Sequence, residues 1–339
     1  MKNIYSETRE DLETYFLSMG EKKFKAVQVL EWLYQKREPN LENWSNIKKE
    51  LREKIAHDFA FTMPKIIKRE QDELTEKYLI ELADNEHIEA VLMRHDYGNS
   101  VCVSSQVGCN MGCAFCESGR LKKIRNLETY EMVCQILLIE KLIEERISSI
   151  VIMGIGEPLD NYENVIRFIK IINDAKAIAI GARHITLSTC GLIPQIKQLM
   201  TLPLQINLAI SLHASNNDLR SQLMQVNKAY NLDILIDTIK EYIDKTNRRV
   251  TIEYVMLNNV NDGIKNAEEL ARLLRGLNVY VNLIPYNETN HLEFKKSNHS
   301  QIMKFYDTLK KNKINVTIRK EFGSKISAAC GQLRSKEVN

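Results

Sequence analysis

Three cysteines stand close together in one short stretch of the chain. Cys109, Cys113 and Cys116 are four and then three positions apart, and Gly108 and Gly112 indicate that they lie in a loop. Cysteine thiolates are the usual ligands of iron–sulfur clusters, and a four-iron cube needs one outer ligand for each iron. A closed zinc site would need a fourth Cys or His, and none follows within the next dozen residues. The spacing therefore predicts a [4Fe-4S] cluster with one iron open to a small molecule.

A parallel sheet is the element expected to position this loop. Beyond residue 100, apolar segments of strand length alternate with amphipathic helical segments, which is typical of α/β folds. Strands are expected at 101–105, 150–153, 185–188, 206–212, 250–256, 280–284 and 315–319. Helices are expected at 130–145, 162–175, 192–200, 232–244, 267–274 and 301–311. Six strand–helix units predict a full or partial β/α barrel.

Polar residues follow most of these expected strands. They are the cysteine loop, 154–158, 188–191, 211–213 and 285–287. Taken singly, a glycine-rich turn or a histidine beside a strand is an ordinary structural feature. Because chemistry in β/α barrels gathers where the strands end, five such groups on one rim predict a single site there.

The residues before 100 show a different pattern. Segments 7–19, 24–36 and 47–59 have helical periodicity, and Pro39 with Asn40 separates the second from the third. A β-hairpin is expected next, with strands at 78–82 and 88–93 and a turn at 84–86.

Composition narrows the class of protein. The chain has 339 residues and 44% hydrophobic content, with a charged start and no apolar run long enough to span a bilayer. Seven cysteines, three of them in the predicted cluster loop, favour a reducing cytosol over a disulfide scaffold. We therefore predict a cytoplasmic protein without membrane contact.

Positive charge is concentrated at the end of the chain. The net charge is +3, but residues 295–339 hold eleven Lys and Arg against three acidic residues. Such a segment suits phosphate contacts to RNA or DNA, and a solvated helix face is the ordinary alternative.

Several motifs together resemble the radical S-adenosylmethionine (SAM) enzymes, and among them the RNA adenosine methyltransferase family of RlmN and Cfr. The resemblance covers nearly the whole chain. It rests on FKA from Phe24 with Trp32, CVSSQVGC from Cys102, GEPL from Gly156, SLH from Ser211, EYVML from Glu253, VNDG from Val260, NLIP from Asn282 and AACGQL from Ala328. The last motif is the most specific, because other radical SAM families lack it.

This resemblance implies a domain organisation. The fold would be α/β, a radical SAM partial (β/α)6 barrel at 97–320. A small N-terminal helical domain at 1–75, of an RNA-binding kind, and a β-hairpin extension at 76–96 would precede it. A C-terminal loop at 321–339 would carry the cysteine that is methylated during the reaction, Cys330.

The resemblance also implies how the reaction runs. Carbons C2 and C8 of adenine are electron-poor, so direct methyl displacement from SAM has the wrong polarity. The family first loads the methyl group onto a protein thiol, here matched by Cys330. A second SAM, bound to the open iron of the cluster, then yields a radical that removes hydrogen from this methyl group. The carbon radical adds to the adenine ring.

The resemblance also assigns the residues that release the product. Glu89 matches the proton acceptor, and Cys102 matches the thiol that releases the product by forming a disulfide with Cys330. Without the resemblance, Cys102 would be read as a buried strand thiol and Glu89 as a residue of an edge strand.

Cofactor contacts carry over in the same way. The cluster would be held by the three cysteines of the loop. SAM, used twice per turnover, would be bound by Gly156, Glu157, Ser188, Ser211, Leu212, His213 and Asn287. Phe115 is expected near the adenine of SAM, whereas Cys134 and Cys190 are expected to be packing residues.

The implied substrate is RNA, with C2 of adenosine 2503 in 23S rRNA as the main target and adenosine 37 of tRNA as another. C8 methylation of the same rRNA adenosine, which confers antibiotic resistance, is the alternative, and a non-catalytic iron–sulfur RNA-binding or redox protein is a third. The chain departs from the RlmN pattern at Ser118, at 121–123, and at Gln225, Glu288 and Lys325, whereas Phe322 with Gly323 resembles Cfr. A flavodoxin or ferredoxin is the expected electron donor, and a monomer the expected state.

Overall fold

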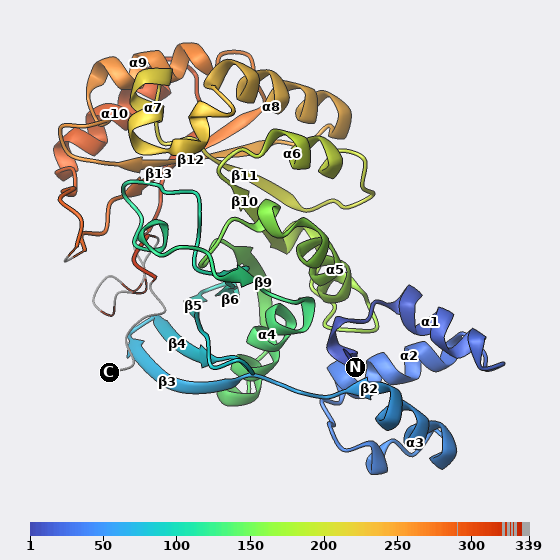
Figure 1. The fold of residues 1–339 in the computed structure, drawn as a ribbon. Coiled ribbons are helices and arrows are strands. Elements are labelled where there is room, and N and C mark those ends of the chain that lie inside the picture. Colours follow the sequence, from blue (N-terminus) through green and yellow to red (C-terminus); the bar gives the residue numbers. More distant parts are fainter. Residues whose placement is uncertain (290, 321–322, 324–325, 327, 329–330, 334–339) are drawn as a thin grey trace.

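The computed structural model describes residues 1–289, 291–320, 323, 326, 328 and 331–333 of the chain. Its main feature is a mixed sheet of ten strands (Figure 1). In spatial order, the strands are β14 (Val316–Ile318), β13 (Val279–Pro285), β12 (Val250–Met256), β11 (Asn207–Ser211), β10 (Ile185–Thr189), β9 (Ile147–Ile152), β6 (Gly98–Cys102), β5 (His87–His95), β4 (Thr75–Glu81) and β3 (Lys65–Asp72).

The seven strands from β14 to β6 run parallel to one another, and helices connect them on the outer side of the curved sheet. The crossover helices are α4 (Thr129–Ile143), α5 (Tyr162–Asn173), α6 (Ile193–Leu199), α7 (Asn217–Leu223), α8 (Leu232–Thr246), α9 (Ile264–Leu273) and α10 (His299–Lys311). Parallel neighbours require such crossovers. The partial (β/α)6 barrel predicted from the sequence is confirmed.

Local sequence explains where these helices begin and end. In α8, the Asn231 side chain accepts a hydrogen bond from the Ile234 backbone N–H, and Asn247 ends the helix with φ +52°. In α5, the apolar residues recur at helical spacing and pack against the sheet, with Val165, Ile169 and Ile172 fully buried. The barrel core is therefore built from the inner faces of the helices and the strands.

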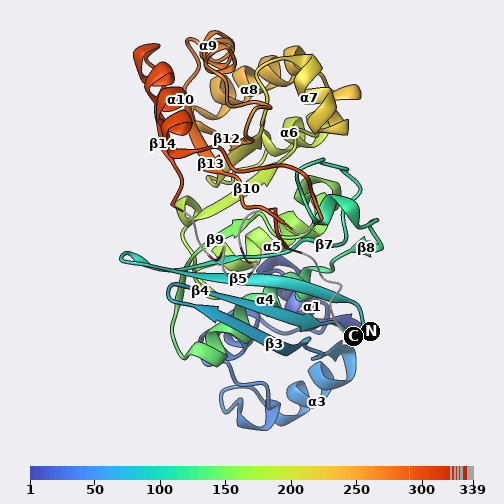
Figure 2. The same ribbon diagram turned by 90° about the vertical axis from the view of Figure 1, so that its left-hand side faces the viewer.

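Three antiparallel strands extend the sheet beyond the barrel. Strands β3, β4 and β5 pair in sequence, and β5 pairs with β6, so the extension is continuous with the barrel sheet (Figure 2). The predicted hairpin corresponds to β4 and β5. Strand β3 was not predicted, because its residues are mostly exposed and charged, so no apolar alternation marks it. The predicted boundary after residue 75 falls within β4, so the predicted helical domain includes β3, which the structure pairs with β4.

The helices of the N-terminal segment are α1 (Arg9–Ser18), α2 (Phe24–Leu30), which continues into a π-helical turn at Glu31–Gln35, and α3 (Lys49–Asp58). The segment packs against α4 through the turn at Ile4–Ser6, with α1 and α2 on the side of α5 and α3 beyond α2 (Figure 1). Ion pairs join the segment to the barrel, with Arg167 bonded to Asp11 at 2.7 Å and Arg37 to Glu140 at 2.6 Å. No helix in the described part of the chain is long and apolar enough to cross a membrane.

Candidate active site

A cavity of about 170 Å³ lies at the carboxyl ends of the parallel strands. It is lined by nearly all the residues that the sequence selected for cofactor binding: Cys109, Cys113, Cys116, Gly156, Glu157, Ser188, Ser211, His213 and Asn287. Phe115 and Gly331 also line it. The structure therefore brings together residues that are widely separated in the sequence, as the barrel interpretation predicted.

The cysteine loop is shaped by two glycines with positive φ. A Cβ on Gly108 (φ +75°) would lie 2.2 Å from the Lys122 carbonyl oxygen, and one on Gly112 (φ +60°) would lie 2.9 Å from the Gln225 side chain. The Cys109 backbone N–H donates to the Leu121 carbonyl at 3.0 Å. Thus 121–123, where the chain departs from the RlmN pattern, form the wall against which the first cysteine packs.

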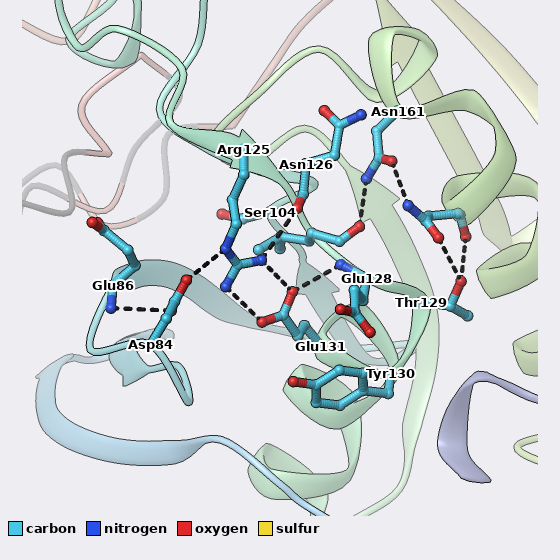
Figure 3. Close-up of polar contacts among 12 residues, drawn as sticks. Asp84, Glu86, Ser104, Arg125, Asn126, Glu128, Thr129, Tyr130, Glu131 and Asn161 are labelled. Atoms are coloured by element: carbon cyan, nitrogen blue, oxygen red, sulfur yellow. Dashed lines mark hydrogen bonds and ion pairs between the residues drawn. The ribbon is translucent and has the colours of Figure 1, made fainter. Parts of the chain in front are cut away.

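Hydrogen bonds and ion pairs attach the two ends of the cysteine loop to the rest of the fold (Figure 3). Arg125 donates to both carboxylate oxygens of Glu131 on α4 at 2.8 Å, and to Asp84 in the β4–β5 turn at 2.7 Å. Asn161 donates to the carbonyls of Ser105 and Leu127 at 2.9 and 2.8 Å. The two ends of the cysteine loop are therefore tied to both the barrel and the antiparallel extension.

The three cysteines are shielded from solvent to different degrees, since Cys109 is buried whereas Cys113 and Cys116 are half-buried. Burial raises the pKa of Cys109 to about 12. The pKa of Cys113 is also raised well above its usual range, first by burial and then by the neighbouring Cys116 and Cys109. Three thiolates this close need positive charge to be stable, which bound iron supplies. No group of three His, Cys, Asp or Glu among the described residues is arranged around a single metal ion.

Glu157 is a buried carboxylate whose orientation is fixed by backbone groups. Its oxygens accept from the N–H groups of Leu159 at 3.0 Å and Cys190 at 2.8 Å. Burial raises its pKa, and these hydrogen bonds oppose that rise. A carboxylate aimed into a cofactor cavity in this way suits the ammonium group of an amino acid.

We expect Gly156→Ala to damage this part of the cavity. Gly156 has φ +108°, and an added Cβ would lie 2.6 Å from the Gln106 side chain and 2.9 Å from its backbone nitrogen. The Gln106 side-chain oxygen also accepts from the Glu157 N–H at 2.9 Å, so the strain would displace Glu157. SAM affinity should fall at least tenfold by equilibrium dialysis. Gly276→Ala is the control for positive φ alone, because a Cβ added at Gly276 would meet no atom within 4 Å. An unchanged SAM affinity in G156A would contradict the role of Gly156 in positioning Glu157.

His213 is held in one neutral form. Its Nδ1 accepts from the Val255 N–H at 3.0 Å, and burial lowers its pKa to about 3. A neutral imidazole that accepts at Nδ1 carries its proton on Nε2. The ring packs edge-on against Phe115 with centroids 4.8 Å apart, which links the cysteine loop to the end of β11.

Glu89 lies on β5, outside the lining of the cavity. It is buried, and its carboxylate is 3.4 Å from the Lys77 ammonium group, which also contacts Glu70 at 2.9 Å. In the antiparallel register, Leu79 is opposite Glu89 and Lys77 is opposite Val91. The two charged side chains therefore meet diagonally on one face of the sheet.

Cys102 lies at the end of β6 on the same face, directly opposite Val91. It packs in an apolar cluster with Val91, Met93 and Ile155, and with Ala328 and Leu333 of the C-terminal segment. Cys330 lies outside the described residues, as do Lys325 and Phe322. The described residues on both sides of Cys330 nevertheless contact the cluster that contains Cys102.

The C-terminal segment is also bonded to the residues that follow the cysteine loop. The Glu117 N–H donates to the Gly331 carbonyl at 2.8 Å, and the Ser118 hydroxyl donates to the Leu333 carbonyl at 2.8 Å. Gln332 donates to the Glu288 carbonyl at 2.9 Å. Two departures from the RlmN pattern, Ser118 and Glu288, therefore hold this segment.

We expect Ser118→Ala to loosen the C-terminal segment. The change removes a buried hydrogen bond and leaves the Leu333 carbonyl without this donor, at a cost of about 1–3 kcal/mol. Proteolytic cleavage within 323–339 should become faster in S118A than in the wild type, whereas Ser118→Thr should keep the hydroxyl and the wild-type rate. Equal cleavage rates in S118A and the wild type would contradict this anchoring role.

Three features differ from expectation or were missed. Leu212 is fully buried in the barrel core and does not line the cavity. Cys190 packs in an apolar cluster as predicted, but it also lines the cavity and donates its backbone N–H to Glu157. Helix α7, with its buried Arg220, was not predicted. Its seven polar-rich residues are too few to show a periodic pattern, although Asn216 before them is a capping residue.

Comparison with known proteins agrees with this geometry. Residues 103–274 match the family model of the radical SAM superfamily, and residues 2–60 match that of the ribosomal RNA large subunit methyltransferase N-terminal domain. A probable dual-specificity RNA methyltransferase RlmN from Enterococcus faecalis is 52% identical, over 99% of this chain and 97% of the relative. This chain belongs to the RlmN family.

Other RlmN relatives agree over their full length. The Spiroplasma citri protein is 50% identical, over 99% of this chain and 98% of that protein, and the Acholeplasma laidlawii protein is 49% identical, over 99% of both. A radical SAM methyltransferase from Sphaerobacter thermophilus superposes with a TM-score of 0.93 at 40% identity, covering 99% of this chain and 100% of that one. The radical SAM fold is thereby confirmed, and with it a [4Fe-4S] cluster and SAM as the cofactors of this RlmN family member.

Proposed function

We propose that this enzyme methylates C2 of adenosine 2503 in 23S rRNA, and adenosine 37 of tRNA as a further substrate. Membership of the RlmN family supports a radical SAM methyltransferase that acts on RNA. The observation that carries the proposal is that the C-terminal segment joins the cavity to Cys102. Gly331 lines the cavity beside the three cysteines, while Ala328 and Leu333 pack around Cys102.

Cys109, Cys113 and Cys116 are proposed as the cluster ligands, because they line one cavity on a loop that leaves space beside them. When bound, the cluster and SAM supply the one-electron chemistry that activates an otherwise inert methyl group. Glu157, with its carboxylate fixed by two backbone donors, would bind the amino group of SAM. Gly156, Ser188, Ser211, His213 and Asn287 would form the rest of its binding site, and Leu212 would contribute through its backbone.

Glu89 is proposed as the general base that removes the proton from the ring carbon once the adenine is joined to Cys330. The unpaired electron left by the radical addition would pass back to the iron–sulfur cluster. The Lys77 ammonium group, 3.4 Å from the Glu89 carboxylate, orients it. Cys102 would then attack the sulfur of Cys330. A disulfide forms, the bond between that sulfur and the carbon on the base breaks, and the carbon takes a proton to become the methyl group.

The test is the nucleoside composition of 23S rRNA and tRNA from cells with and without the gene. Loss of 2-methyladenosine from both RNAs on deletion is expected. A gain of 8-methyladenosine that depends on the gene would assign C8 chemistry, and no change in either RNA would contradict the proposal in favour of a non-catalytic iron–sulfur protein.

The electron donor, oligomeric state and cellular compartment of the enzyme are proposed from its chemistry. Reduction of a buried cluster needs a low-potential donor, so a flavodoxin or ferredoxin is the proposed partner. We also propose that the enzyme acts as a monomer in the cytoplasm, where its RNA substrates are found.

A further inference from the structure

Arg220 is a fully buried arginine on α7. Burying a guanidinium group is costly unless the charge is compensated, and arginines inside proteins normally pair with a carboxylate. No carboxylate among the described residues forms an ion pair with Arg220. Its positive charge therefore needs another explanation.

The hydrogen-bond partners of Arg220 are all neutral oxygens. It donates to the Cys190 carbonyl at 2.7 Å, to the Asn227 side-chain oxygen at 3.0 Å, to the Leu212 and Tyr230 carbonyls at 3.3 Å, and to the Ser211 carbonyl at 3.5 Å. These contacts satisfy its N–H groups but supply no negative charge. They also place the guanidinium behind the ends of β10 and β11, which face the cavity.

The same helix supports the cysteine loop. The Leu223 carbonyl, at the end of α7, accepts from the Ala114 N–H at 2.9 Å, between the second and third cysteines. Phe115, Cys113 and Cys116 pack in one apolar cluster with Leu223 and Cys190. As a thiolate, Cys113 would interact electrostatically with Arg220. The uncompensated cation is therefore hydrogen-bonded to the apolar group of residues that contains Cys113 and Cys116.

We propose that Arg220 is a positioning residue whose buried positive charge raises the reduction potential of the iron–sulfur cluster. The inference rests on the proposed ligands Cys109, Cys113 and Cys116. A cluster held by three thiolates gains one negative charge when it takes one electron from its donor. A fixed cation in a site that water does not screen stabilises this reduced form. The three anionic ligands in turn compensate the buried guanidinium.

A purely structural role is the competing explanation, since Arg220 joins five backbone and side-chain groups. Two pairs of variants, one at Arg220 and one at Asn227, separate the electrostatic explanation from the structural one. Arg220→Gln removes the charge and some hydrogen bonds, whereas Arg220→Lys keeps the charge with fewer donors. Asn227→Asp keeps Arg220 in place and sets a carboxylate against it, and Asn227→Ala is its uncharged control for the lost amide contacts.

The measurement is the midpoint potential of the reconstituted holoenzyme, from anaerobic dithionite titration followed by electron paramagnetic resonance, with iron content and thermal unfolding as controls. R220Q and N227D should make reduction about tenfold less favourable, which is 59 mV for a one-electron couple. R220K and N227A should remain near the wild-type potential.

Equal midpoints in N227D and N227A would overturn the electrostatic role, and so would a shift in R220K as large as that in R220Q. N227D and N227A keep this test decisive if R220Q fails to fold. Wild-type holoenzyme without a cluster signal would refute the ligand assignment, and with it this inference. Normal RNA methylation with unshifted midpoints would refute this inference alone.

Discussion

Cys102→Ala should convert the enzyme into a protein that remains covalently attached to its RNA. In the proposed reaction, the methyl carbon joins the base while it is still bound to the sulfur of Cys330. Release needs a second thiol, and Cys102 packs against residues on both sides of Cys330. Without it, the carbon–sulfur bond cannot be broken by disulfide formation. A protein–RNA band that survives denaturing electrophoresis should accumulate in proportion to the enzyme added.

Cys134→Ala is the matched control. Cys134 is also a fully buried thiol, but it lies inside α4 in the barrel core, and its variant should turn over without a persistent adduct. Cys102→Ala combined with Cys330→Ala should give no adduct at all. Normal turnover by C102A, with methylated Cys330 present, would contradict the resolving role.

Glu89→Gln should stop product formation at the proton-removal step. General-base catalysis contributes about 10²–10⁴-fold to rates, so methylation should fall by at least a hundredfold. Because the proton leaves after the base is joined to Cys330, the covalent adduct should accumulate in this variant as well. Single-turnover rates and the electrophoretic band measure the two effects.

Glu70→Gln provides the control for the charges around Glu89. Glu70 contacts Lys77 at 2.9 Å, as Glu89 does at 3.4 Å, so E70Q perturbs the same lysine and keeps the base. Its rate should stay within about threefold of the wild type, since one partly exposed ion pair contributes little. An equal loss in E70Q and E89Q would identify the whole ion-pair group, rather than Glu89, as the important feature.

Much of the barrel could be predicted because its strands and helices carry strong periodic signals. Strand β12 was predicted at its observed bounds, and α5, α8 and α10 to within about two residues at each end. The cysteine loop stood out because its ligands are close together in sequence. Glu89 and Cys102 were selected only through the family resemblance, since a single carboxylate or thiol on a strand has no spacing to mark it.

The features that could not be predicted from the sequence, namely β3, α7 and the role of Ser118, depend on contacts between distant segments. Strand β3 is stabilised by pairing with β4 and not by an apolar pattern of its own. The part played by α7 follows from Ala114 and Cys190, which are about 110 and 30 residues away from it in sequence. The anchoring role of Ser118 is apparent only from its hydrogen bond to the Leu333 carbonyl, which is 215 residues away in sequence. Such roles are visible in three dimensions and not in local composition.

In the proposed reaction, the methyl group passes through Cys330 as a one-carbon unit that loses one hydrogen before it reaches the adenine. The most direct test uses SAM with three deuterium atoms in its methyl group, reconstituted enzyme and an unmodified 23S rRNA fragment. Mass spectrometry of the nucleosides should show 2-methyladenosine whose methyl group retains two deuterium atoms. A methyl group that retains all three would show direct transfer and would contradict the proposed role of Cys330.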